Sequence, residues 1–145
     1  MMTRMLKMTL ACLVIAPLPV AAEMIELNKR FVLPVAAIDA TSFEVVENNG
    51  AGAAHMWCGA SIYARKVLGQ RDADLYLKVA RGPSKKFSGR KGVVFTVEPL
   101  ANAVAQNSFS LRQVGSTHSV SASHIVCRDN REVFIRLDSG AVMRR

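Results

Sequence analysis

The sequence is poor in aromatic and acidic residues. Phe, Trp and Tyr make up 6% of its 145 residues, and 11 Asp and Glu stand against 19 Lys and Arg, which gives a formal net charge of +8. No apolar run reaches the roughly 18–20 residues that a membrane-spanning helix needs, so we expect no transmembrane segment. Half of the residues are hydrophobic, which excludes a disordered chain, and the length fits one domain.

Several motifs that carry chemistry are also absent. The sequence has no Gly-rich nucleotide fingerprint, no phosphate-binding loop, no Gly-x-Ser-x-Gly elbow and no His-Glu-x-x-His zinc helix. Two pairs of carboxylates could in principle do acid–base chemistry. We expect all four to be solvated surface groups, because they lie on strand edges and turns: Glu44, Glu47, Asp72 and Asp74. The sequence therefore favours a protein that is not an enzyme, and it implies no cofactor.

The chain begins with the pattern of an export signal. Segment 1–22 carries two basic residues, Arg4 and Lys7, followed by an apolar stretch and then by the small residues Val-Ala-Ala, which a signal peptidase reads. We expect cleavage after Ala22, which leaves 23–145 as a single domain. The signal predicts that the protein is periplasmic or secreted.

Removal of the signal changes the charge and the cysteine count. The segment contains two basic residues and no acidic one, so the mature chain has 123 residues, 17 of them basic and 11 acidic, with a net charge of +6. Two of the three cysteines remain, Cys58 and Cys127. Both expected compartments are oxidising enough for a disulfide to persist.

The clearest element of the mature chain is an amphipathic helix at about 52–68. Its apolar residues recur at spacings of three and four, the period of one helix face: Ala53, Met56, Trp57, Ala60, Ala64, Val67 and Leu68. Asn49 is expected to cap its start. Gly69 is expected to adopt the left-handed conformation just past its end.

Alternation of apolar and polar residues predicts strands in the rest of the chain. Segment 23–41 reads as an extended lead-in, turns are expected at 48–50 and 129–130, and the strand candidates are 42–47, 75–79, 93–97, 108–113, 119–127 and 133–137. We expect an α+β fold: an antiparallel sheet of four to six strands with the helix packed on one face, the simplest way to bury both apolar surfaces.

The two remaining cysteines predict one disulfide. Cys58 and Cys127 are 69 positions apart, and the chain-entropy model gives about 4 kcal/mol for closing a loop of that length. An even count in an exported domain is typical of such a bond. It predicts that the middle of the helix faces a strand ending at Cys127.

Two other interpretations of the cysteines stay open. Each cysteine follows a histidine by three positions, so His55, Cys58, His124 and Cys127 could bind zinc. Positions i and i+3 of a regular strand point to opposite faces, which argues against His124 and Cys127 sharing an ion. Cys58 could also be a nucleophile activated by a histidine, but a disulfide would remove it.

The segment 81–91 joins the two clearest strands and is rich in basic residues. It has five basic residues and no acidic one, with an aromatic residue in the middle: Arg81, Lys85, Lys86, Phe87, Arg90 and Lys91. Basic residues interleaved with an aromatic one suit a polyanion. In an exported protein this would be an anionic lipid or envelope polymer rather than nucleic acid. The interpretation preferred from sequence is simpler, a solvated loop that keeps the surface hydrophilic.

Three runs resemble a group of small exported proteobacterial proteins of unknown function: Trp57–Ala64, Arg81–Ser84 and Gly89–Phe95. The resemblance covers 43–98. It implies export and a compact domain, and it supplies no activity, cofactor or catalytic residue.

We therefore expect an exported, non-catalytic structural or protein-binding module stabilised by one disulfide. The alternatives are a binder of anionic envelope or lipid surfaces through 81–91, and a Cys/His metal-binding or thiol-dependent protein. The expected partner is an envelope protein or an anionic envelope polymer or lipid.

Overall fold

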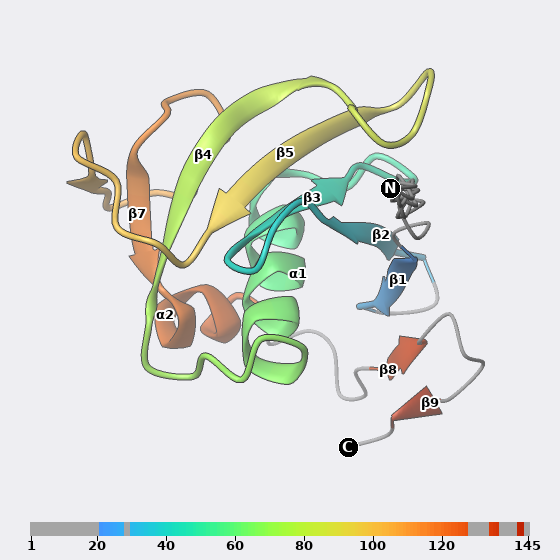
Figure 1. The fold of residues 1–145 in the computed structure, drawn as a ribbon. Coiled ribbons are helices and arrows are strands. Elements are labelled where there is room, and N and C mark those ends of the chain that lie inside the picture. Colours follow the sequence, from blue (N-terminus) through green and yellow to red (C-terminus); the bar gives the residue numbers. More distant parts are fainter. Residues whose placement is uncertain (1–20, 28–29, 128–133, 137–141, 144–145) are drawn as a thin grey trace, which may run out of the picture.

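The computed structural model describes residues 21–27, 30–127, 134–136 and 142–143. The expected signal up to residue 20 and the expected turn at 129–130 lie outside these ranges. Within them the chain is α+β, with one mixed sheet and two helices (Figure 1). The elements are, in chain order, β1 Ala22–Glu26, β2 Val32–Ala37, β3 Ser42–Val46, α1 Ala53–Lys66, β4 Asp74–Pro83, β5 Lys91–Thr96, β6 Val104–Ala105, β7 Ser116–Ser119, α2 Val120–Ile125, β8 Phe134–Arg136 and β9 Val142–Met143.

The sheet has nine strands in the order β6-β7-β4-β5-β3-β2-β1-β8-β9. Every described pairing is antiparallel except β6 with β7, which is parallel. The predicted antiparallel arrangement is thus largely confirmed, but the sheet is larger than the four to six strands expected. Part of the excess is the lead-in segment, which, with the last residue of the expected signal, forms the hairpin β1–β2, paired in register from Ala22 with Ala36 to Glu26 with Val32.

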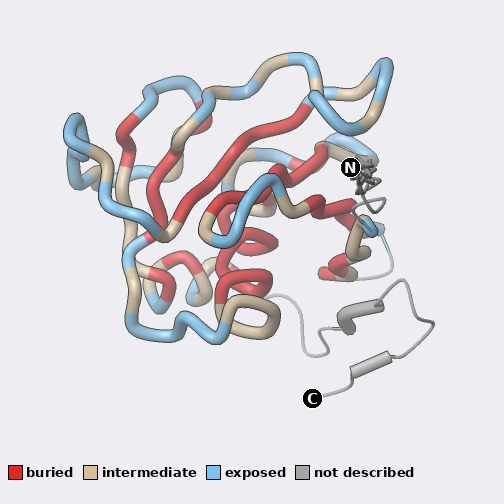
Figure 2. The backbone as a smooth tube through the Cα atoms, viewed as in Figure 1, coloured by how far each residue is buried: buried red, intermediate tan, exposed pale blue. Residues whose placement is uncertain are grey.

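The predicted helix is confirmed as α1, and it packs on one face of the sheet (Figure 1). Figure 2 shows the buried part of the chain concentrated in α1 and the central strands. Trp57 of α1 is fully buried, and its ring lies 4.8 Å from that of Phe95 on β5 in an edge-on arrangement. Phe43 on β3 contacts Tyr63 one and a half turns further along α1, with ring centroids 4.4 Å apart.

The ends of α1 confirm one expectation and correct another. Gly69 has a φ of +70°, as expected for the residue that follows the helix. Asn49 does not cap the start; the cap is Gly52, whose backbone N–H donates to Nδ1 of His55 at 3.2 Å. Asn49 instead takes a positive φ in the turn, and its side-chain amide donates to the carbonyl of Arg30 at 2.8 Å.

Two predicted strands are wrong. Segment 108–113 is irregular, and segment 119–127 holds the end of β7 followed by α2. The cause is local: the side chain of Ser119 accepts a hydrogen bond from the N–H of Ala122 at 3.0 Å, which is the bond of a helix N-cap. The cap starts a helix where the sequence was expected to continue as a strand.

Candidate functional site: the disulfide and the basic loop

The predicted disulfide is present and joins the two helices. Cys58 lies in the middle of α1 and Cys127 just past the end of α2, with their Cα atoms 5.4 Å apart. Both are buried, with 1% and 6% of their surface exposed. The bond therefore connects helix to helix, and the prediction that Cys127 ends a strand is wrong.

The histidines beside the cysteines do not form the alternative zinc site. His124 lies 3.8 Å from Sγ of Cys127 through its Nδ1, because α2 places positions i and i+3 on one side and the strand geometry assumed from sequence does not apply. His55 instead caps α1, with its ring 4.0 Å from that of Phe31. Among the residues that the structure describes, no three His, Cys, Asp or Glu side chains are grouped so as to hold a metal ion.

The basic loop, residues 81–91, is a folded turn at the end of the β4–β5 hairpin. The N–H of Ser84 donates to the carbonyl of Arg90 at 2.8 Å, and the N–H of Arg90 donates to the carbonyl of Phe87 at 3.2 Å. Gly89 has a φ of +76°, a left-handed conformation that glycine adopts without strain. The backbone of the loop is thus hydrogen-bonded to itself at its base and at its tip.

Beneath the loop lies Glu44, a carboxylate that was expected from sequence to be solvated. It is 1% exposed. Its neighbours Phe43 and Val45 on β3 belong to the buried core, so strand alternation directs Glu44 to the opposite face of the sheet. Gly92 on the adjacent strand makes room for it, because a Cβ there would lie 2.6 Å from Oε1 of Glu44.

The carboxylate of Glu44 accepts three hydrogen bonds from the loop. Its Oε1 accepts from the N–H of Lys85 at 2.9 Å, and its Oε2 accepts from Oγ of Ser84 at 2.9 Å and from the N–H of Lys86 at 3.2 Å. Oγ of Ser84 in turn accepts from the N–H of Phe87 at 2.9 Å. The loop is therefore wrapped around a buried side chain of the sheet, and the sequence gives no local sign of this.

The two arginines of the loop are tied to the segment between β3 and α1. Nε of Arg81 donates to Oε2 of Glu47 at 2.7 Å, and its Nη2 forms an ion pair with the same oxygen. Nη2 of Arg90 donates to Oδ1 of Asn48 at 2.5 Å. These contacts fix the loop laterally and occupy part of the guanidinium hydrogen-bonding capacity.

The three lysines of the loop are exposed: Lys85, Lys86 and Lys91. Within the described ranges none of them has an acidic partner. The loop therefore holds three uncompensated ammonium groups on a structured backbone.

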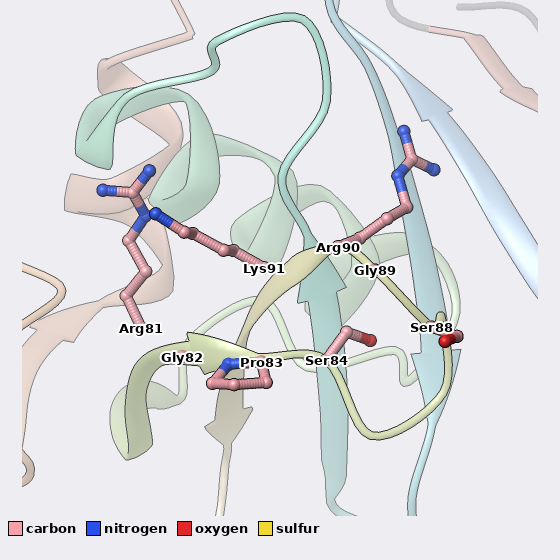
Figure 3. A pocket seen from close by; sticks show the side chains of 8 residues that line it. All are labelled: Arg81, Gly82, Pro83, Ser84, Ser88, Gly89, Arg90 and Lys91. Atoms are coloured by element: carbon pink, nitrogen blue, oxygen red, sulfur yellow. The ribbon is translucent and has the colours of Figure 1, made fainter.

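A hollow of about 580 Å³ lies along the loop, and no acidic residue lines it (Figure 3): its lining is Arg81, Gly82, Pro83, Ser84, Ser88, Gly89, Arg90 and Lys91. Figure 3 shows the side chains of Arg81 and Lys91 extending to one side and that of Arg90 to the other. Phe87 is not part of this lining and is half-buried.

A second hollow, of about 420 Å³, separates the start of α1 from segment 109–112 and is bordered by both Arg81 and Glu47. An aromatic cluster holds that segment in place. Nε1 of Trp57 donates to the carbonyl of Ser110 at 3.0 Å, and the rings of Phe109 and His118 lie 4.3 Å apart. Burial lowers the pKa of His118 below 6.5, against the smaller opposing effect of its hydrogen bond to a backbone carbonyl.

No protein-family model matches the chain, and no curated protein or solved structure matches it either. Neither described helix has the length and apolar character needed to cross a membrane. The site must therefore be interpreted from its own geometry.

Proposed function

We propose that this protein is an exported, non-catalytic binding module that attaches to anionic phospholipid surfaces through the lysines of the basic loop. One observation carries the proposal: three exposed lysines without acidic partners project from a loop whose backbone is already hydrogen-bonded and whose hollow has no acidic lining. The proposal adopts the polyanion-binding interpretation of segment 81–91 in place of the solvated-loop interpretation, because a solvated loop does not require such an arrangement.

The order of the loop favours binding because little conformational entropy is lost when the charges meet a surface. Immobilising a fully flexible backbone of eleven residues on binding would cost about 11–22 kcal/mol, at about 1–2 kcal/mol per residue. Hydrogen bonds from Ser84, Lys85 and Lys86 to Glu44 have already fixed this backbone in the free protein. The backbone that carries the lysines is thus ordered before any surface is bound.

The type of free charge favours a surface over a discrete phosphate ligand. Arginine recognises phosphate through its planar, two-pronged hydrogen-bond geometry, whereas lysine acts as a flexible point charge. In this loop Arg81 is paired with Glu47, and one guanidinium nitrogen of Arg90 is bonded to the neutral amide of Asn48. Among the described residues, three of the four loop charges without an acidic partner are therefore lysines. Point charges suit a diffuse anionic potential, to which each contributes about 1 kcal/mol near a charged bilayer.

Co-sedimentation with vesicles tests the proposal. The mature protein is expected to bind phosphatidylglycerol-containing vesicles at about 50 mM salt and not to bind neutral phosphatidylcholine vesicles. At about 500 mM salt it is expected to dissociate, because salt screens the attraction between surface charges. The double variant K85E/K86E is expected to bind at least about 30-fold more weakly. The loss of two lysines at about 1 kcal/mol each corresponds to about 30-fold, because 1.4 kcal/mol is a factor of ten, and the two added negative charges weaken binding further.

The matched control is R65E/R71E, which changes the net charge equally. Arg65 lies in the last turn of α1 and Arg71 in the segment that follows it. The end of α1 lies away from the tip of the β4–β5 hairpin (Figure 1). Equal weakening by both double variants would refute a dedicated surface. Binding to a soluble anionic glycan polymer in place of vesicles would assign the loop to an envelope polymer and refute the lipid.

Export is the other part of the proposal, supported by the disulfide and by the signal pattern of segment 1–22. Mass spectrometry of the protein recovered from its producing cells is expected to show a chain beginning at Glu23. A chain that retains residues 1–22 would overturn this part.

A further inference from the structure

Glu44 is out of place in an anion-binding surface if charge alone is considered. It is a buried carboxylate directly beneath a loop of five basic residues, where its negative charge reduces the potential that an anionic ligand meets. Sheets also rarely bury a carboxylate, because desolvation is costly unless hydrogen bonds compensate for it. Here both oxygens accept hydrogen bonds, and all three donors belong to the loop.

We infer that Glu44 is a positioning residue, an internal anion that occupies the backbone N–H groups of the basic loop and holds Lys85 and Lys86 pointing outward. This inference rests on the proposed function. Successive backbone N–H groups in a turn can form an anion-binding concavity. The N–H groups of Lys85 and Lys86 donate to the two oxygens of one carboxylate, that of Glu44, which reaches them from inside the protein.

The packing around Glu44 shows that the arrangement depends on several residues at once. Gly92 leaves the space that the carboxylate occupies. Oγ of Ser84 donates to Glu44 and accepts from Phe87 and Lys86, so one hydroxyl links the carboxylate to the following turn. External anions thus meet side-chain ammonium groups, since the backbone donors of Lys85 and Lys86 are already used.

The direction in which vesicle affinity changes on neutralising Glu44 distinguishes a positioning role from a simple charge effect. The variant E44Q removes one negative charge, so electrostatics alone predicts tighter binding to anionic vesicles. A glutamine side chain has only one acceptor oxygen and places an NH₂ group where the other oxygen was. It therefore cannot accept from both Lys85 and Lys86. We expect the loop to open and E44Q to bind phosphatidylglycerol vesicles about fivefold more weakly, despite its more positive charge.

The variant E47Q is the matched control. Glu47 lies just past the end of β3, is paired with Arg81, and changes the net charge by the same amount when neutralised. It accepts no hydrogen bond from residues 84–87, so its neutralisation leaves the contacts of Glu44 in place and releases the charge of Arg81 at the base of the loop. We expect E47Q to bind about fivefold more tightly. Two variants of equal charge would then shift the affinity in opposite directions.

Amide hydrogen exchange supplies a readout that does not depend on any ligand. In E44Q the amides of residues 85–87 are expected to exchange faster than in the wild type, whereas in E47Q they are expected to be unchanged. The variant S84A keeps the net charge and is expected to accelerate exchange at residues 86 and 87 and to weaken vesicle binding. S84A therefore replaces E44Q in the test if E44Q does not fold. The fluorescence of the single tryptophan shows whether each variant is folded.

The outcomes separate the inference from the proposed function. Tighter vesicle binding by both E44Q and E47Q would overturn the positioning role, as would unchanged exchange of the loop amides in E44Q and S84A. Faster exchange in E44Q and S84A together with no vesicle binding by the wild type would leave the structural role of Glu44 intact and refute the proposed function alone.

Discussion

Breaking the disulfide is expected to remove a large fraction of the folding stability. The bond between Cys58 and Cys127 closes a loop of 69 positions. The chain-entropy model converts that length into about 4 kcal/mol of stabilisation, against a total of about 5–15 kcal/mol for a typical domain. In a chain of this size, a loss of about 4 kcal/mol corresponds to a decrease in Tm of about 15 °C.

Urea denaturation with and without reductant measures this contribution. The wild type refolded under reducing conditions keeps both sulfur atoms, so its difference from the oxidised protein isolates the crosslink. The variant C58A/C127A additionally loses buried sulfur packing and is expected to be less stable still, by about 1–2 kcal/mol. Because both cysteines are almost fully buried, reduction of the folded protein is expected to be slow and to follow the rate of unfolding.

A reduced protein within about 1 kcal/mol of the oxidised one would refute the reasoning, since the entropy of a loop this long is too large to vanish without strong residual structure in the unfolded chain. A rapid reaction of both thiols in the folded protein would contradict the burial of the bond.

Three further predictions concern single residues. G92A is expected to lower the free energy of unfolding by about 1–3 kcal/mol, because the added methyl group displaces Glu44 from its donors. W57F is expected to cost about 1–3 kcal/mol by leaving the carbonyl of Ser110 without its indole partner and a cavity beside it. Burial lowers the pKa of His118, so as the pH decreases the unfolded chain is protonated before the folded protein. The free energy of unfolding is therefore expected to fall as the pH decreases from about 7.5 through about 6.5, and H118Q is expected to lose that dependence.

Urea titrations test all three predictions. If G92A is as stable as the wild type, the carboxylate of Glu44 moves aside at no cost in folding free energy. W57F must be followed by circular dichroism, since it removes the only tryptophan. An identical pH dependence in the wild type and H118Q would show that the histidine has the same proton affinity in both states.

The features that could be predicted from the sequence depend on local patterns. The helix follows from apolar spacing over about five turns, and the disulfide follows from cysteine count and compartment. The strands that became β3, β4 and β5 show the alternation expected of half-buried segments. α2 was missed because six residues are too few to show a helical period, so its cap at Ser119 was the only signal.

The site could be predicted only in part, because its decisive contacts are remote in sequence. The basic loop was recognisable from composition alone. The pairing of Arg81 depends on Glu47, 34 positions away, and the placement of Arg90 depends on Asn48, 42 positions away. The burial of Glu44 depends on a loop some 40 positions later, and no pattern around Glu44 records that contact.

The two outermost strands of the sheet, β6 and β9, are each described as two residues long. The margin at β6 thus offers few free backbone groups to a neighbouring molecule. A long open margin would favour strand pairing between copies of the chain while it folds. The two-residue β6 limits such pairing, so on this side the sheet offers little template for edge-to-edge aggregation.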